Sequence, residues 1–156
     1  MLAFLFALLI GVIAGLRAMT APAAVALGAR LGMIDVSGSW LSFFAHPAAV
    51  WIFSVLALAE LVTDQLPGTP SRTLPLPFGT RIISGAVCGA SFGLNAGSVW
   101  AGAVLGAVGA IIGTLGGYAA RAHLARSFGR DRPAAFIEDA VAIVVAAASV
   151  FVIAHA

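Results

Sequence analysis

Carboxylates inside apolar stretches are the residues of this sequence best placed to do chemistry. Glu60 and Asp64 are four positions apart, so on a helix they lie on one face. They stand near the C-terminal end of an apolar stretch, where the helix dipole is already negative. Because the two charges repel each other and the dipole repels both, the pair needs a counterpart. That counterpart is an arginine from another segment, a proton or a bound cation.

A second acidic pair, Glu138 and Asp139, lies one to two turns into the last apolar stretch. The positive end of a helix dipole favours carboxylates there, so a structural salt bridge is enough to explain them. We nevertheless expect this pair on the same side of the protein as Glu60 and Asp64. The sequence therefore predicts a site of carboxylates and arginines, in which Arg81 and Glu138 or Asp139 are second partners.

Arg17 interrupts the first apolar stretch. Counted from Leu2, it lies roughly 22 Å along a helix at about 1.5 Å per residue. Glu60, counted back from the cytoplasmic face, lies only about 10 Å deep by the same rise, so a direct pair requires a tilted or broken helix. Pro22 can supply the break, since it cannot donate to the carbonyl four residues earlier. Interrupted helices build the substrate sites of many transporters, although an arginine that only ties neighbouring helices together explains Arg17 as well.

Basic residues gather in two predicted loops, 67–81 and 121–132. They are Arg72, Arg81, Arg121, Arg126, Arg130 and Arg132. Apart from Arg81, we expect them to attract anionic lipid headgroups on the cytoplasmic side. The prolines of 67–77 predict an extended loop with little helix.

Composition sets the environment of these charges. The chain has 156 residues, of which 62% are hydrophobic and 9% charged, and its mean hydropathy is +1.09. A soluble domain carries roughly 25% charged residues, so a cytosolic enzyme, a nucleic-acid binder and a disordered tail are excluded. The single cysteine, Cys88, allows no internal disulfide and no CxxC metal site. We predict an integral membrane protein that needs no cofactor or metal and has the lipid bilayer as its surroundings.

Five apolar stretches predict an all-α protein with about five membrane-spanning helices in one domain, 1–156. Their predicted bounds are 2–29, 47–66, 78–94, 97–120 and 133–154, with the first interrupted near Arg17–Pro22. Basic loops stay in the cytoplasm, which predicts an N-terminus inside and a C-terminus outside. If 2–16 and 18–29 form a re-entrant hairpin instead, the N-terminus moves outside and nothing else changes.

Glycines at helical spacing mark the predicted hairpin 78–120. They are Gly85, Gly89, Gly93, Gly97, Gly102, Gly106, Gly109, Gly113 and Gly117. In lipid, small residues let helix backbones approach closely, and this approach holds the helices together. The pattern predicts a tight antiparallel pair or a seam between subunits of a homo-oligomer. A narrow permeation path lined by these glycines is the alternative.

Four stretches of the chain resemble a family of bacterial inner-membrane proteins catalogued as a domain of unknown function, DUF4126. They are GLRAMTAPA (15–23), ALAELVTDQLPGTPSRTLP (57–75), RIISGAVCGA (81–90) and IEDAVAI (137–143). The resemblance spans nearly the whole chain in order. It implies that the family's motifs include Arg17, Glu60, Asp64, Pro67, Arg72, Arg81, Glu138 and Asp139. Gln65 stands where family members commonly carry a lysine, and the resemblance implies no activity.

These residues favour a small homo-oligomeric transporter or channel-like protein. In such a cycle Glu60 binds a proton or cation, Asp64 holds or relays it, and Arg17 contacts a polar solute. A second hypothesis is a non-catalytic scaffold that binds anionic lipid or a partner membrane protein, with charge pairs that only fix the fold. An intramembrane enzyme acting on lipid phosphates is third, since no serine–histidine or HExxH arrangement is present.

Overall fold

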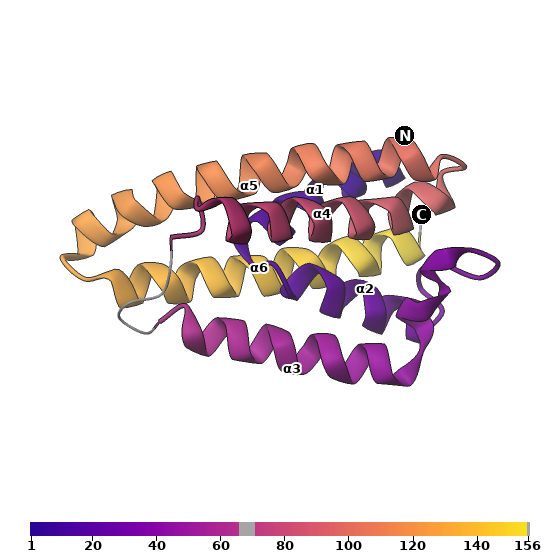
Figure 1. Ribbon diagram of the computed structural model, residues 1–156, viewed down its shortest axis with the longest axis horizontal. Coiled ribbons are helices and arrows are strands. Elements are labelled where there is room, and N and C mark those ends of the chain that lie inside the picture. The colour runs from indigo at the N-terminus through magenta and orange to yellow at the C-terminus, as the bar shows by residue number, and fades with distance from the viewer. Residues whose placement is uncertain (66–70, 156) are drawn as a thin grey trace.

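Helices make up the fold of this protein (Figure 1). The computed structural model describes residues 1–65 and 71–155, and every regular element within these ranges is helical. The elements are α1 (Leu2–Leu16), α2 (Thr20–Arg30), a short 3-10 helix η1 (Trp40–Ala45), α3 (Pro47–Thr63), α4 (Pro75–Asn95), α5 (Val99–Phe128) and α6 (Asp131–Ala154). The all-α prediction is thus confirmed for the described part of the chain.

Two of these helices, α5 and α6, are long and apolar enough to cross a membrane. Only 33% of the most apolar window of each is buried inside the protein, so most of their apolar side chains lie on its outside. A core helix of a soluble protein has the opposite distribution. Helices α1 and α3 are apolar as well but have 15 and 17 residues.

The predicted interruption of the first apolar stretch is confirmed, because α1 ends at Leu16 and α2 begins at Thr20. Arg17 between them is extended, with φ −138° and ψ 110°. Pro22 lies in the first turn of α2, where its missing N–H breaks no helical hydrogen bond. The two helices run in opposite directions, and both chain termini lie at the same end of the molecule (Figure 1). The prediction of one span over 2–29 is therefore wrong, and the hairpin alternative agrees with the structure; the membrane side of each terminus stays a prediction.

Glycines bring α4, α5 and α1 into backbone contact. A Cβ placed on Gly106 would lie 2.1 Å from the carbonyl oxygen of Gly85, and one on Gly89 would lie 2.4 Å from that of Gly102. Farther along α5, Gly109 and Gly113 meet the backbone of α1 just as closely. The tight pairing is confirmed, and it lies within one chain. Since the backbones touch, the seam between α4 and α5 has no room for a permeation path.

The glycine pattern also contains an exception, and the bounds of the pair differ from prediction. Gly97 lies in the turn between α4 and α5 with φ +77° and open space around it, so its predicted packing role is wrong. Only a residue without a side chain adopts this conformation readily. The predicted loop 121–132 is also wrong, since α5 continues to Phe128 and α6 begins at Asp131. The charged residues of this segment up to Phe128 lie on the continued helix, beyond its apolar part, and do not end it.

The predicted proline-rich loop 67–77 is only partly described. Residues 66–70 lie outside the described residues, and 71–74 form a turn. Pro75 and Pro77 belong to the first turn of α4, where proline is favoured because no N–H is needed. The described part of the predicted loop is therefore a turn followed by helix rather than an extended segment.

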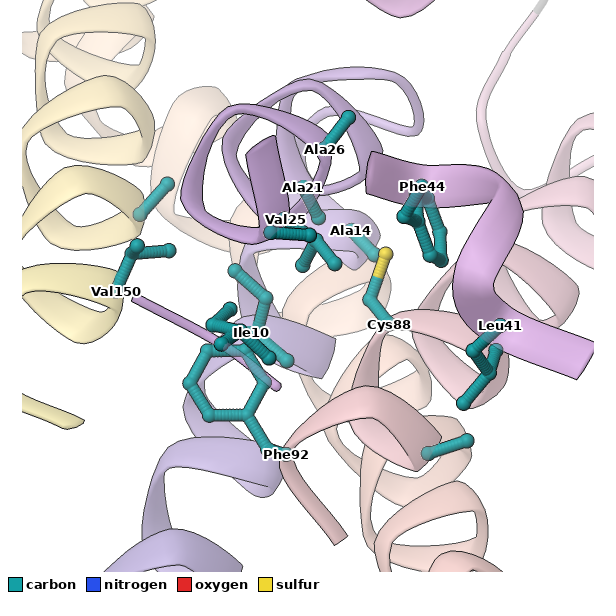
Figure 2. Packing of buried hydrophobic residues seen from close by; sticks show 14 of the residues in the cluster. Ile10, Ala14, Ala21, Val25, Ala26, Leu41, Phe44, Cys88, Phe92 and Val150 are labelled. Carbon is teal, nitrogen blue, oxygen red and sulfur yellow. The ribbon is translucent and has the colours of Figure 1, made fainter. Parts of the chain in front are cut away.

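A hydrophobic core joins α1, α2, α4, α6 and η1 (Figure 2). Ile10, Val25, Phe44, Cys88 and Phe92 are all buried there. A buried free cysteine packs like a small hydrophobic residue. Cys88 is fully buried among apolar side chains and therefore fills space in the core, as predicted.

Candidate functional site

Buried and half-buried charges from α3, α4, α6 and the segment before α4 surround Arg17 at the break between α1 and α2. We call this group the ionic cluster; its members are Arg17, Arg72, Arg81, Glu60, Asp64, Glu138 and Asp139. Arg17 lies in the break itself, Glu60 and Asp64 at the C-terminal end of α3, and Arg81 in α4. Glu138 and Asp139 come from α6. The structure therefore brings together all six residues that the sequence predicted for the site, and adds Arg72.

Two members of the ionic cluster stabilise the broken ends of the first apolar stretch. The carboxylate of Glu60 accepts hydrogen bonds from the backbone N–H groups of Ala18 and Met19, both at 2.8 Å, at the positive end of α2. Arg81 Nη1 donates to the carbonyls of Gly15 and Leu16, at 3.1 and 2.8 Å, at the negative end of α1. Each charge thus faces a helix end of opposite sign.

Hydroxyl groups complete the hydrogen bonding at the break. Ser84 Oγ donates to the carbonyl of Ala18 at 2.6 Å, and Thr114 Oγ1 is 3.2 Å from the carbonyl of Gly15. Arg81 Nη2 also lies 3.5 Å from Glu60 Oε1, which joins the two charges across the break. The backbone groups freed by the break therefore have partners from α3, α4 and α5.

Arg17 is fully buried and holds two carboxylates from different helices. Its Nε donates to Asp139 Oδ1 at 2.6 Å, and its Nη1 contacts Asp64 Oδ2. Gln65 Nε2 approaches the other oxygen of Asp139 at 3.5 Å. The partners of Arg17 are thus Asp64 and Asp139 rather than Glu60, and Glu138 Oε2 lies 3.8 Å from its Nη2. Because the guanidinium is enclosed by these groups, the expectation that Arg17 contacts a solute does not agree with this geometry.

Arg72 forms a bidentate pair with Glu138. Its Nη1 contacts Oε1, and its Nη2 donates to Oε2 at 2.9 Å. Gly117 of α5 makes room for the pair, since a Cβ there would lie 3.1 Å from Glu138 Oε1 and 3.3 Å from Arg72 Nη1. Arg72 is only 8% exposed, so its predicted role at lipid headgroups is wrong. For Arg72, the bidentate pair with the buried Glu138 outweighs the loss of solvation by water and headgroups.

The edge of the ionic cluster is formed by Arg121 and Asp131. Arg121 Nε and Nη2 donate to the two oxygens of Asp131 at 2.9 and 2.6 Å, and its Nη2 also donates to the backbone carbonyl of Asp64. This pair is neutral by itself and faces the outside of the molecule. The remaining arginines predicted to meet headgroups, Arg126, Arg130 and Arg132, are exposed.

The ionic cluster has one more carboxylate than it has arginines. Arg72 pairs with Glu138, and Arg81 pairs with Glu60. Arg17 alone serves both Asp64 and Asp139. The excess is shared over a connected network, since Glu138 Oε2 also lies 3.8 Å from Arg17 Nη2 and 3.6 Å from Arg121 Nη1, while the two aspartates share Arg17. Within 1–65 and 71–155, no three His, Cys, Asp or Glu side chains are arranged to hold a metal ion.

Asp35 is the one acidic residue that lies away from this end of the molecule. Its carboxylate accepts hydrogen bonds from the hydroxyl and the N–H of Ser37, which hold the pKa of Asp35 below its usual range. Asn95 bonds to its backbone and fixes the loop to the end of α4. Asp35 is therefore a suitable control for substitutions in the ionic cluster.

Several partners in the site were not predicted from the sequence. Ser84 and Thr114 are placed at the break only by the packing of α1 on α4 and α5, and Gly117 was predicted as a packing residue, not as a neighbour of the ionic cluster. Gln65 is adjacent to Asp64, but its approach to Asp139 depends on how α3 lies relative to α6. A search for polar residues within glycine-rich helices would have found Ser84 and Thr114.

Fold and site together define a class, an all-helical protein with a buried ionic cluster at a broken helix and largely apolar outer faces. Residues 4–154 match the family described as Domain of unknown function (DUF4126), and the chain belongs to this family. The resemblance stated from the four motifs is confirmed. No curated protein and no solved structure matches the chain.

Proposed function

We propose that this chain is an integral protein of the bacterial inner membrane, in which α3, α4, α5 and α6 cross the bilayer and α1 and α2 form a re-entrant hairpin. The support is the large number of exposed apolar side chains on these helices. Trp51 is 74% exposed, Ile83 67%, Trp100 83% and Val144 65%. Apolar surface of this extent marks contact with lipid or with other proteins.

The orientation follows from the exposed arginines. Arg126, Arg130 and Arg132 lie beside the junction of α5 and α6, at the end of the molecule opposite to both termini (Figure 1). Basic segments remain in the cytoplasm. The ionic cluster then lies toward the cytoplasmic side, and both termini lie outside.

Within this membrane protein, the ionic cluster acts as a proton-binding site of a small transporter or channel-like protein. The observation that carries this proposal is the excess carboxylate at Arg17. Ionisable groups within a membrane are costly unless they serve a function, and a proton shared by Asp64 and Asp139 makes the ionic cluster neutral. Access is provided at Asp64, whose side chain is 14% exposed whereas that of Arg17 is fully buried.

Protonation of this pair also supplies a mechanism for movement. Asp64 lies at the end of α3 and Asp139 lies in α6, and Arg17 holds the two together. A protonated aspartate attracts Arg17 less strongly, which loosens the end of α3 from α6. Binding and release of the proton then alternate between a closed and an open cytoplasmic end, with a homo-oligomer providing the rest of a sheltered path.

The test is proton flux in liposomes that contain a pH-sensitive dye and are driven by a potassium diffusion potential. We expect D64N and D139N to reduce the flux at least tenfold, while D35N leaves it unchanged. Gln65→Lys supplies the missing positive charge beside Asp139 and should also abolish the flux, although every carboxylate is retained. Gln65→Met is its uncharged control. Unchanged flux in folded D64N and D139N would refute the proton site.

A scaffold that binds anionic lipid is the second candidate, and the exposed Arg126, Arg130 and Arg132 favour it. For a scaffold, the native protein conducts no protons, and D64N and D139N change only its stability. Binding to phosphatidylglycerol vesicles should then decrease when the three arginines are replaced by glutamine. The intramembrane enzyme has no observation in its favour.

A further inference from the structure

An apolar groove runs between α3 and α6, with α2 as its floor. Its volume is about 750 Å³. Leu58 of α3 and Ala147 of α6 contribute to its walls, and Ala24 and Gly28 of α2 contribute to its floor. Helix α2 packs on both α3 and α6, and so keeps the two walls apart. None of the residues that line this groove belongs to the ionic cluster.

The dimensions of the groove indicate a chain-like occupant. Its floor extends from Thr20 to Leu31, which is roughly 16 Å at 1.5 Å per residue. A helix is about 10 Å across, whereas an extended hydrocarbon chain is much narrower and can follow the whole length of the floor.

The inner end of the groove carries a hydroxyl group without a partner. Thr20 lines the groove at the start of α2 and is 7% exposed. Its Oγ1 is buried and has no hydrogen-bond partner within the described ranges. A buried polar atom left unpaired is costly, and a ligand at this end can satisfy it once the Thr20 hydroxyl rotates toward the groove. Ser54 of α3 adds a second hydroxyl to the lining.

The charge at this end selects the head group of the ligand. Glu60 lies next to Leu61, a lining residue, and its carboxylate binds the N–H groups just before Thr20. The excess negative charge of the ionic cluster is also close, on the same ends of α3 and α6. An anionic head would be repelled, and any charged head is costly at this depth. A neutral head that hydrogen-bonds meets neither penalty.

We propose that the groove between α2, α3 and α6 binds one molecule of a neutral, single-chain lipid, with its alcohol or carbonyl head at Thr20 and its chain along α2 toward Leu31. This site differs from the headgroup contacts of the exposed arginines, which attract phosphate. It also does not depend on proton transport, because binding is measured without any flux.

The experiment uses hexadecanol that carries a diazirine in its chain, with the full-length protein in detergent micelles. After illumination, mass spectrometry locates the label. We expect it on residues that line the groove in α2, α3 and α6. Ala24→Trp and Ala147→Trp fill the groove from two different helices and should reduce this labelling at least fivefold. Ala119→Trp, on an exposed face of α5, is the matched control and should not reduce it.

Two further measurements test the head group. Thr20→Val removes the hydroxyl but keeps the shape, and should weaken binding by about two- to tenfold, the effect of one neutral hydrogen bond. Hexadecanoic acid with the same diazirine should label the groove less than the alcohol does. Equal labelling by acid and alcohol overturns the proposal, and so does unchanged labelling in folded variants that carry tryptophan. Cross-linking of two copies of the chain through the groove would also overturn it.

Discussion

Replacing Glu60 by glutamine is the most direct test of how the broken helix is held. The carboxylate accepts two backbone hydrogen bonds at 2.8 Å and lies 3.5 Å from Arg81. Hydrogen bonds to charged groups contribute about 1.5–3 kcal/mol each. Glutamine keeps one acceptor oxygen and presents an NH₂ group to the second N–H, so one such bond is lost and the other is weakened.

The expected loss for Glu60→Gln is therefore about 3 kcal/mol in the free energy of unfolding. It agrees with the range of about 3–5 kcal/mol for breaking a buried charge pair, since Arg81 remains buried. For a chain of this length, 3 kcal/mol lowers Tm by roughly 6–12 °C. Thermal unfolding of the purified protein in detergent measures this shift.

The control for this substitution is Asp35→Asn, which removes a carboxylate of the exposed loop and should shift Tm by less than about 2 °C. The double variant of Glu60→Gln with Arg81→Met gives the coupling between the two charges. If the free energy of unfolding of Glu60→Gln is within about 1 kcal/mol of that of the native protein, the carboxylate does not hold the break, and our account of the site is incorrect.

Two other predictions concern packing and topology. Gly106→Ala should destabilise the protein by at least about 2 kcal/mol, because its Cβ meets the backbone of Gly85; Gly116→Ala, which meets open space, should be neutral or slightly stabilising, and equal Tm values for the two variants would contradict the contact. Reporter fusions at Arg72 and Ser127 should both indicate the cytoplasm, whereas fusions at the N-terminus and at Trp40 should both indicate the outside. An N-terminal fusion that reports the cytoplasm would exclude the hairpin of α1 and α2.

Much of the fold follows from patterns along the chain. The glycine spacing in 85–113 predicts close packing because only the absence of side chains lets helix backbones touch in an apolar setting. The break near Arg17 follows from an arginine and a proline in one apolar stretch. These signals are local in the sequence, so they predict structure without any knowledge of the neighbouring helices.

The direction in which the chain runs after the break does not follow from local patterns. Residues 2–29 satisfy the length of one span and equally that of a hairpin, so composition cannot distinguish them. Packing decides the matter, because Gly11 and Gly15 seat α1 on α5 while Gly28 seats α2 near Val150 of α6. The same holds for Arg72, whose partner in α6 is 66 positions away.

The sequence by itself determined that charged residues are few, that they stand inside apolar stretches and that each must be compensated. Those conclusions rest on solvation energies, which depend on residue type alone. Which arginine meets which carboxylate was decided only by the tertiary structure, because a charge pair depends on distances of a few ångströms between helices far apart in the chain. For this reason the sequence predicted the members of the site, whereas the sharing of Arg17 by Asp64 and Asp139 became evident only in the folded molecule.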